Sequence, residues 1–369
     1  MKKVLVSLIS DQTIPNVLFI KEFFNKVNKF LFITTDEMES KAVLPNIIKV
    51  CNINENKYEK IIIPEYEIDK IKELLNLTCN SLDEFYIVNL TGGTKIMSIG
   101  VYEFFKERKS EIFYLPIGKN EYKKIFPFPV ENNSLKTRLN VEDYMLSYGI
   151  EIKKYAKTTT KDYESNKRFL NEIFFNYNRE IKFLVEFQNR KEIKNLSEIN
   201  LDKHKAELTD NLNNLDNLIK QLNFNYQNLK KSELKYITGG WFEEYIYQTI
   251  KESGNIKDET ILLNPVISRN NIQNEFDIAI CYENRLDIIE CKTSLKYQDK
   301  NLLNDTIYKQ SALRKEFGLT VNTIIVTLDE INDENRKRAD YMKIKILDKN
   351  YVLDENKLKE AILNIIGIK

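Results

Sequence analysis

Histidine is almost absent from this sequence of 369 residues, which contains only His204. That residue lies in the charged segment LDKHKAELTD, where we expect it to face solvent. Its isolation nearly excludes zinc sites built on histidine, ribonucleases that use two histidines, and a Ser-His-Asp triad. Any chemistry of this chain must therefore rest on carboxylates, lysines, tyrosines or a metal ion.

Cysteine, glycine and proline are also scarce. The four cysteines lie far apart and form no CxxC pair, which argues against a zinc site and for a reducing compartment. Glycine occurs 10 times and proline 7 times, while 42% of the residues are hydrophobic, a composition typical of a folded chain rich in helices and strands. For this length we expect two or three domains.

The sequence also lacks a signal peptide, a long apolar span and a charge excess. We therefore expect a soluble, cytoplasmic protein with no membrane partner. The formal net charge is +1, so any surface that binds nucleic acid must be local.

A β-hairpin is predicted within NEFDIAICYENRLDIIECKT, residues 274–293. Arms rich in isoleucine and aromatic side chains, 276–282 and 286–291, flank the polar dipeptide Glu283-Asn284. If these two residues form a two-residue turn, the pairing is fixed along the whole hairpin. This hairpin is the element around which we interpret the rest of the chain.

The predicted pairing brings charged residues together at the open end of the hairpin. Asp277 lies opposite Glu290, and Lys292 leaves the same face two residues later. Opposed carboxylates repel, and a hard divalent cation such as Mg²⁺ or Mn²⁺ removes that repulsion. Such an ion polarises a phosphodiester and activates a water, with lysine stabilising the developing charge. An ordinary amphipathic hairpin with a charged outer face is the alternative.

The same residues resemble a known motif. Asp277 followed by Glu290-Cys291-Lys292 resembles the PD-(D/E)xK motif of restriction-endonuclease-like nucleases, although Phe276 stands where the family has proline. The resemblance implies that Asp277, Glu290 and the backbone carbonyl of Cys291 hold a Mn²⁺ or Mg²⁺ ion. It also implies that Lys292 is catalytic.

The segment GGWFEEY, residues 239–245, resembles the first helix of that nuclease core, GxWLExxV. In the family an acid near the start of this helix often completes the metal site. The register suggests Glu243 as that catalytic acid, with Glu244 as the alternative.

A charged helix is expected over residues 306–317. In the superfamily this helix flanks the active site, so that Gln310 or Lys309 would touch the scissile strand. A solvated charged face is the alternative. The helix also carries Arg314 and Lys315.

Residues 1–130 alternate apolar strands with helices, which predicts a parallel, Rossmann-like α/β domain. We expect a helix with Pro15 in its first turn. A second helix should follow the segment TGGTK, residues 91–95, and end near residue 105. We expect strands at 3–9, 30–34, 48–53, 85–90 and 111–116, a hairpin partner at 123–128, and a helix at 66–77.

Two polar loops of this domain, residues 10–13 and 91–95, each follow a strand and precede a helix. Parallel sheets bind ligands at such positions. The adjacent glycines of TGGTK let backbone N–H groups approach an anion, and Thr94 and Lys95 add a hydroxyl and a positive charge. The loop matches neither GxxxxGK[ST] nor GxGxxG, which disfavours ATP hydrolysis and dinucleotide binding. A phosphate ester is the natural ligand, and a tight turn with an exposed lysine is the alternative.

The order strand–SDQT–helix and strand–NLTGGTKIMSIG–helix resembles the CARF domain, the sensor of cyclic oligoadenylates in type III CRISPR immunity. TGGTK followed by methionine is typical of the subgroup fused to a PD-(D/E)xK nuclease, a family that covers essentially the whole chain. The resemblance implies that the ligand contacts Ser10, Asp11, Gln12, Thr13, Gly92, Gly93, Thr94 and Lys95.

We therefore expect a CARF sensor over 1–135, a helical linker over 136–235 and a restriction-endonuclease-like α/β domain over 236–369. The linker should contain a helix at 141–148 and helical segments at 163–194 and 202–230, the latter with apolar positions such as Leu208 and Leu215. In the nuclease we expect helices at 241–250, 332–341 and 356–366, and strands at 260–265, 322–328 and 343–347.

The expected function is a metal-dependent endonuclease that cleaves single-stranded RNA or DNA, or nicks supercoiled plasmid, when a cyclic oligoadenylate binds. A single TGGTK loop carries one lysine, too little to surround a ring of phosphates, so we expect a two-fold dimer that binds one ring. An even-numbered ring suits that symmetry, and the resemblance indicates cyclic tetra-adenylate. The alternatives are a non-catalytic cyclic-nucleotide regulator and a transcription factor that uses the middle helices.

Overall fold

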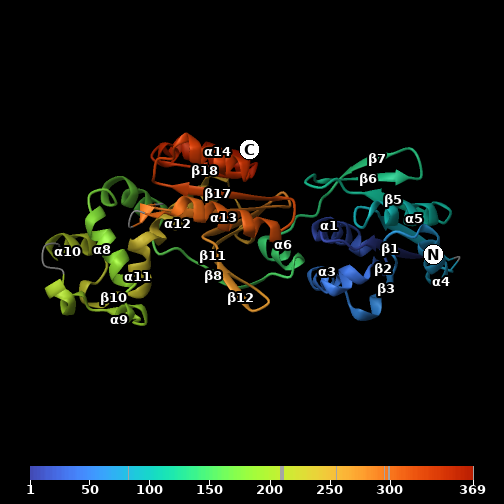
Figure 1. Cartoon of the computed structure of the whole chain (residues 1–369), viewed down its shortest axis with the longest axis horizontal. Helices are drawn as coiled ribbons and strands as arrows, with labels where there is room; N and C mark the ends of the chain where they lie inside the picture. Colours follow the sequence, from blue (N-terminus) through green and yellow to red (C-terminus); the bar gives the residue numbers. More distant parts are fainter. Residues whose placement is uncertain (82, 208–211, 255, 295, 298–299, 369) are drawn as a thin grey trace.

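The protein has the mixed α/β architecture that the sequence predicts, and its two large sheets have seven strands each. Figure 1 shows the C-terminal domain in the middle of the molecule, with the N-terminal domain on one side and the helices of residues 163–235 on the other. The middle of the sequence therefore does not separate the two domains in space. The computed structural model describes residues 1–81, 83–207, 212–254, 256–294, 296–297 and 300–368.

Seven strands form the N-terminal sheet. They are β1 (Lys2–Leu8), β2 (Lys29–Thr34), β3 (Tyr58–Ile62), β4 (Glu84–Asn89), β5 (Ser110–Tyr114), β6 (Glu121–Phe126) and β7 (Glu131–Ser134). Their order is β3-β2-β1-β4-β5-β6-β7, with β1 to β5 parallel and β6 and β7 antiparallel at one edge. Because β1 and β4 are parallel neighbours, the loops that follow them emerge side by side at the same edge.

One predicted strand of this domain is wrong. Most of the apolar run at 48–53 lies in helix α3 (Val43–Cys51), whose buried residues include Val43, Ile47 and Val50. This spacing is helical, and a short apolar run alone does not distinguish a strand from a buried helix. The third strand is instead β3, whose sequence YEKII lacks a continuous apolar signal because it lies at the edge of the sheet. The other helices are α1 (Thr13–Phe23), α2 (Asp36–Ser40), α4 (Ile68–Thr78) and α5 (Lys95–Lys106).

The C-terminal sheet is built around the predicted hairpin. Its strands are β8 (Glu151–Ala156), β11 (Ile261–Arg269), β12 (Ile272–Glu275), β13 (Ile278–Tyr282), β14 (Arg285–Lys292), β17 (Val321–Thr327) and β18 (Ile344–Leu347). The order is β12-β11-β13-β14-β17-β18, and β8 pairs with β11. Tyr282 pairs with Arg285, and both turn residues have positive φ, 49° at Glu283 and 62° at Asn284. The two-residue turn and its register are therefore confirmed.

The middle of the chain differs from its prediction. The sequence predicts no strand at β8, but this strand forms and joins the C-terminal sheet. The helical segment expected over 202–230 is interrupted at Asn223, which has a φ of 54°. Asparagine favours such helix ends over helix interiors. Position 208 lies outside the described residues. The elements are α6 (Val141–Ser147), α7 (Tyr163–Arg168), α8 (Asn178–Gln188), α9 (Lys191–Lys194), β9 (Glu198–Ile199), α10 (Leu212–Gln221), β10 (Leu229–Lys230) and α11 (Lys231–Lys235).

The helices that cover the C-terminal sheet are α12 (Trp241–Gly254), α13 (Leu302–Glu316), α14 (Asp333–Tyr341), α15 (Lys349–Val352) and α16 (Glu355–Ile366). Two short strands, β15 (Lys296–Tyr297) and β16 (Lys300–Asn301), precede α13. Among the described residues, no helix combines the length and the apolar character that crossing a bilayer requires.

Alternate residues of the hairpin contribute to two different hydrophobic cores. Ile280 and Ile289 face a core shared with α12 and the middle helices, which includes Trp241. Ile288 on the opposite face belongs to a core that includes Tyr144 of α6 and apolar residues of the N-terminal domain. Because side chains alternate between the two faces of a strand, the hairpin packs against α12 and the middle helices on one face and against α6 and the N-terminal domain on the other.

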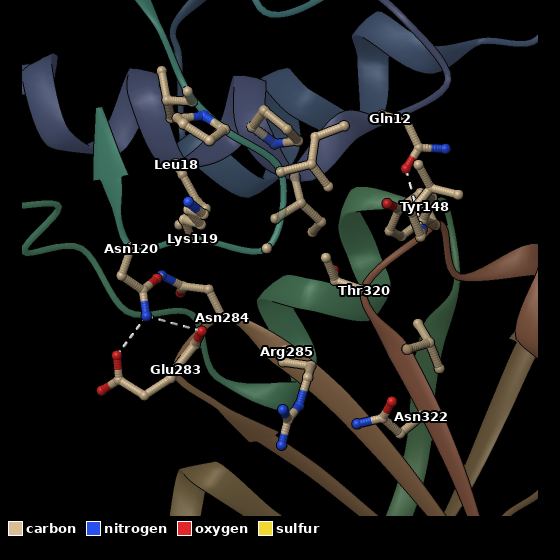
Figure 2. A pocket seen from close by; sticks show the side chains of 18 of the residues that line it. Gln12, Leu18, Lys119, Asn120, Tyr148, Glu283, Asn284, Arg285, Thr320 and Asn322 are labelled. Carbon is tan, nitrogen blue, oxygen red and sulfur yellow. Dashed lines mark hydrogen bonds between the residues drawn. The ribbon is translucent and has the colours of Figure 1, made fainter. Parts of the chain in front are cut away.

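Polar contacts also join the two domains at the turn of the hairpin (Figure 2). Asn284 Oδ1 accepts a hydrogen bond from Leu139 N at 2.9 Å, and Asn284 Nδ2 donates to Asn120 Oδ1 at 2.7 Å. Nearby, Leu319 N donates to Gln12 Oε1 at 3.2 Å. Gln12, Asn120, Asn284 and Leu319 are among the residues that line a cavity of 180 Å³. Sites for drug-sized ligands measure about 300–1,000 Å³, so this cavity is too small for a cyclic oligonucleotide.

Gly318→Ala should weaken this junction. Gly318 has a φ of +83°, and an added Cβ would lie 2.0 Å from the hydroxyl of Tyr148. We expect a loss of roughly 1–3 kcal/mol in the free energy of unfolding, measured by urea denaturation. Gly118→Ala is the control, because Gly118 has a similar φ of +75° while its Cβ would meet only Thr320 Cγ2 at 3.5 Å. Equal losses in both variants would contradict a role for the Tyr148 contact.

Candidate functional site

The open end of the hairpin brings together the residues that the sequence predicts there. Lys292 Nζ lies 2.7 Å from Glu290 Oε1 and 3.7 Å from Asp277 Oδ2. The same ammonium donates to the carbonyl oxygen of Cys291 at 3.3 Å. Asp277 Oδ2 accepts a hydrogen bond from Cys291 N at 2.6 Å. Two carboxylates, a carbonyl and an ammonium therefore converge at one point.

Burial makes these charges interact strongly. Burial and the negative charges of Glu243 and Glu290 raise the pKa of Asp277 to about 7. For Lys292, burial acts to lower the pKa, but Asp277 and Glu290 favour the ammonium and raise the pKa above its usual value. The site thus holds a concentration of negative charge that one lysine only partly compensates.

The structure separates the two candidate acids of α12. Glu243 lies in the first turn of the helix and accepts a hydrogen bond from Asn264 Nδ2 at 2.6 Å, beside Asp277. Glu244 is buried and accepts hydrogen bonds from the backbone N–H groups of Thr160 at 2.8 Å and Lys161 at 3.1 Å. This geometry favours Glu243 as the third carboxylate and gives Glu244 a structural role.

Helix α13 places two polar residues against Glu290. Gln310 is fully buried, and its Nε2 donates to Glu290 Oε2 at 3.0 Å. Lys309 Nζ lies 3.9 Å from Glu290 Oε1, and half of its side chain is exposed. Lys309 is therefore the more accessible of the two, whereas Gln310 is buried and holds Glu290 in place. Arg314 donates to the carbonyl oxygens of Val321 and Met342, and the side chain of Lys315 lies outside the described part of the structure.

Sequence reasoning missed two residues beside this site. Asn264 carries no motif, and its hydrogen bond to Glu243 depends on how β11 meets α12. The second is Lys235 at the end of α11, whose Nζ lies 3.1 Å from Glu275 Oε1. Burial lowers the pKa of Lys235, but Glu243 and Glu275 more than offset this effect and the pKa is raised.

The donors present fit a hard divalent cation. Within the residues that the structure describes, no three histidine, cysteine or acidic side chains form a ready-made metal cage. However, the ammonium of Lys292 lies among the oxygens of Asp277, Glu290 and Cys291, so a positive charge already occupies the centre of the expected donor set. Carboxylate and carbonyl oxygens are the ligands that Mg²⁺ and Mn²⁺ prefer.

The two polar loops of the N-terminal domain touch one another. Gly92 packs so closely that an added Cβ would lie 2.2 Å from the carbonyl oxygen of Leu8 and 3.1 Å from Ser10 Oγ. Thr94 caps α5 by accepting from Met97 N at 3.2 Å. Both loops thus form one surface at the edge of the sheet, where α1 and α5 begin.

Other predicted ligand residues differ in what they contact. Asp11 pairs with Lys41 at 2.8 Å, and Thr13 is buried. Gln12 turns toward the C-terminal domain, where its side-chain oxygen accepts from Leu319 N. Lys95 and Gly93 are exposed beside these residues.

Comparison with protein families identifies both domains. Residues 4–144 match the Card1 CARF domain, and residues 230–366 match the Card1-like endonuclease domain. This chain belongs to the CARF-domain endonucleases. Together the two matches cover most of its length, in the order that the sequence predicts. No curated protein matches the sequence.

Solved structures share the fold of the whole chain. Can2 from Sulfobacillus thermosulfidooxidans, solved with cyclic tetra-adenylate, is 20% identical with a TM-score of 0.74, and 99% of each chain is covered. Protein VC1899 from Vibrio cholerae is 17% identical with a TM-score of 0.78, covering 99% of this chain and 98% of that protein. A type III CRISPR defence DNA nuclease activated by cyclic oligoadenylate is 13% identical with a TM-score of 0.54, covering 91% of this chain and 47% of that protein.

The raised pKa of Asp277 predicts a pH-dependent stability. A carboxyl group whose pKa rises on folding stabilises the fold at low pH, and this contribution is lost as the pH rises through the folded-state value of about 7. Without divalent ions, the wild type should lose roughly 2–3 kcal/mol relative to Asp277→Asn between pH 5 and pH 8. The asparagine oxygen still accepts from Cys291 N. Urea unfolding at both pH values measures the difference.

Asp258→Asn is the matched control, because the side chain of Asp258 is 84% exposed. A wild-type pH profile parallel to that of Asp277→Asn would show that Asp277 ionises normally.

Proposed function

We propose that this CARF endonuclease is a metal-dependent enzyme activated by cyclic tetra-adenylate, acting in type III CRISPR defence on single-stranded RNA or DNA or by nicking plasmid DNA. The observation that carries the catalytic part is the convergence of Asp277, Glu290 and Lys292 at the open end of one hairpin. The endonuclease family of residues 230–366 supports the same reaction class.

Asp277, Glu290 and the carbonyl of Cys291 would hold Mg²⁺ or Mn²⁺, with Glu243 beside them. When bound, such an ion polarises the phosphodiester and lowers the pKa of a bound water. Gln310 keeps Glu290 in place through its hydrogen bond of 3.0 Å, and Cys291 N keeps Asp277 in place.

Lys292 and Lys309 provide positive charge on the substrate side. The ammonium of Lys292 is fixed by its two carboxylate neighbours and can stabilise charge that develops on the phosphate. Lys309 is half exposed at the same site and can contact the nucleic-acid backbone. Neither role depends on the identity of the base, so we expect these two contacts to add no sequence preference.

For the sensor, the touching loops of residues 10–13 and 91–95 support binding of a phosphate-rich ring. Two copies related by a two-fold axis would place both Lys95 side chains and both sets of loop N–H groups around one cyclic tetra-adenylate. The Can2 structure contains that ligand in a protein of the same fold. The ring would activate only by binding the cleaving arrangement more tightly than the resting one.

The test uses the purified full-length chain with Mn²⁺, cyclic oligoadenylates of several ring sizes, and labelled single-stranded RNA, single-stranded DNA and supercoiled plasmid. Glu290→Gln should abolish cleavage of every substrate, because it removes the ligand charge, and should leave the affinity for the ring unchanged. Calorimetry measures ring binding. Cleavage by this variant at a rate near that of the wild type would reject the site.

Lys95→Ala should remove activation by the ring while preserving Mn²⁺ binding and the unfolding midpoint. Each charged hydrogen bond lost with the lysine contributes roughly 1.5–3 kcal/mol, and a two-fold site loses two of them. Lys106→Ala, at the opposite end of α5, is the control and should leave activation intact. Full cleavage by the wild type without the ring, or tight ring binding by a monomer, would contradict this part of the proposal.

A further inference from the structure

Strand β11 changes partners at Asn264. Residues 261–263 pair with β13, whereas residues 266–269 pair with β12. Between these segments Asn264 has a φ of 49°, a left-handed conformation that asparagine adopts more readily than most residues. Pro265 follows and has no N–H to donate to a neighbouring strand. Asn264 therefore lies at an irregular point of the sheet, directly beside the open end of the hairpin.

Two of the three carboxylate residues contact this one asparagine. Asn264 Nδ2 donates to Glu243 Oε2 at 2.6 Å, and Asn264 N donates to the carbonyl oxygen of Asp277 at 2.8 Å. A carboxylate only accepts hydrogen bonds, so the NH₂ group of the asparagine must face Glu243. Because Glu243 belongs to α12 and Asp277 to the hairpin, Asn264 connects two elements that also share a hydrophobic core but lie far apart in the sequence.

Asp277 is thereby held from both sides. Its carbonyl oxygen is fixed by Asn264, and its carboxylate is fixed by Cys291 N at 2.6 Å. Glu243, in contrast, has its side chain fixed by the asparagine amide alone among the hydrogen bonds that the described residues show. The position of Glu243 relative to Asp277 therefore depends on the side chain of Asn264.

We propose that Asn264 is a positioning residue for the metal site, which aligns Glu243 with Asp277 so that both can bind one divalent ion. This inference rests on the proposed function, since it requires that Glu243 contribute to ion binding. Residues that orient metal ligands typically change metal affinity by about 10- to 100-fold when they are removed.

The test measures Mn²⁺ affinity of the full-length protein by calorimetry, without substrate or ring. Asn264→Gly keeps a residue that tolerates positive φ and the backbone N–H to Asp277, but removes the amide. We expect its Mn²⁺ affinity to fall roughly 10- to 100-fold. In a Glu243→Ala background the same substitution should cause no further loss, because Asn264 acts through Glu243.

Each outcome decides the matter. Unchanged affinity in Asn264→Gly would overturn the proposal, and so would losses that simply add in the double variant, because a general disturbance of the fold is independent of Glu243. Asn264→Asp provides a second readout: two facing carboxylates should shift the pH dependence of Mn²⁺ binding upward. Failure of the wild type to bind Mn²⁺ at all would refute the proposed function instead.

Discussion

The two-residue turn at Glu283 and Asn284 is the constraint on which both ends of this molecule depend. Both residues adopt positive φ, and this geometry fixes the register of β13 against β14. A shift of this register by one residue would turn Asp277 and Glu290 to opposite faces of the sheet, and the two carboxylates would no longer converge. The turn itself contacts the CARF domain, through hydrogen bonds of Asn284 with Leu139 and Asn120. One rigid hairpin thus spans the distance from the domain junction to the carboxylates, about 20 Å for strands of this length.

A second connection runs along α13. Gln12, in the first sensor loop, accepts a hydrogen bond from Leu319 N, just after this helix ends. One turn and more before that end, Gln310 holds Glu290. Besides the shared hydrophobic core, polar contacts of the CARF domain therefore reach the hairpin turn and the loop after α13, and the hairpin and α13 also carry residues of the candidate site. Cores are packed on both faces of the hairpin, and a close-packed interior deforms little.

Local sequence predicted those parts of the fold that local geometry determines. The hairpin register follows from the length of its turn, and the strands β1 and β4 from continuous apolar runs. Residues 48–53 were assigned to a strand because a short apolar run fits two structures, and only packing against α1 selects the helix. The strand β8 and the pairing of Asn264 with Glu243 had no local signal, since both depend on a neighbour far away in the sequence. The motif indicated the charged residues that converge at the open end of the hairpin, whereas it did not indicate Asn264, which contacts two of them.

The charge balance of the candidate site links Lys292 to the carboxylates around it. Without a divalent ion, Lys292 bridges Glu290 and Asp277, and the pKa of Asp277 is still raised to about 7. One ammonium therefore offsets only part of the repulsion that Glu243 and Glu290 exert on Asp277. The oxygens of Asp277, Glu290 and Cys291 would hold the divalent ion of the proposed function, and its charge would lower the pKa of Asp277. Lys292, at 2.7 Å from Glu290 Oε1, would supply positive charge next to that ion, where it would stabilise the charge that develops on the phosphate.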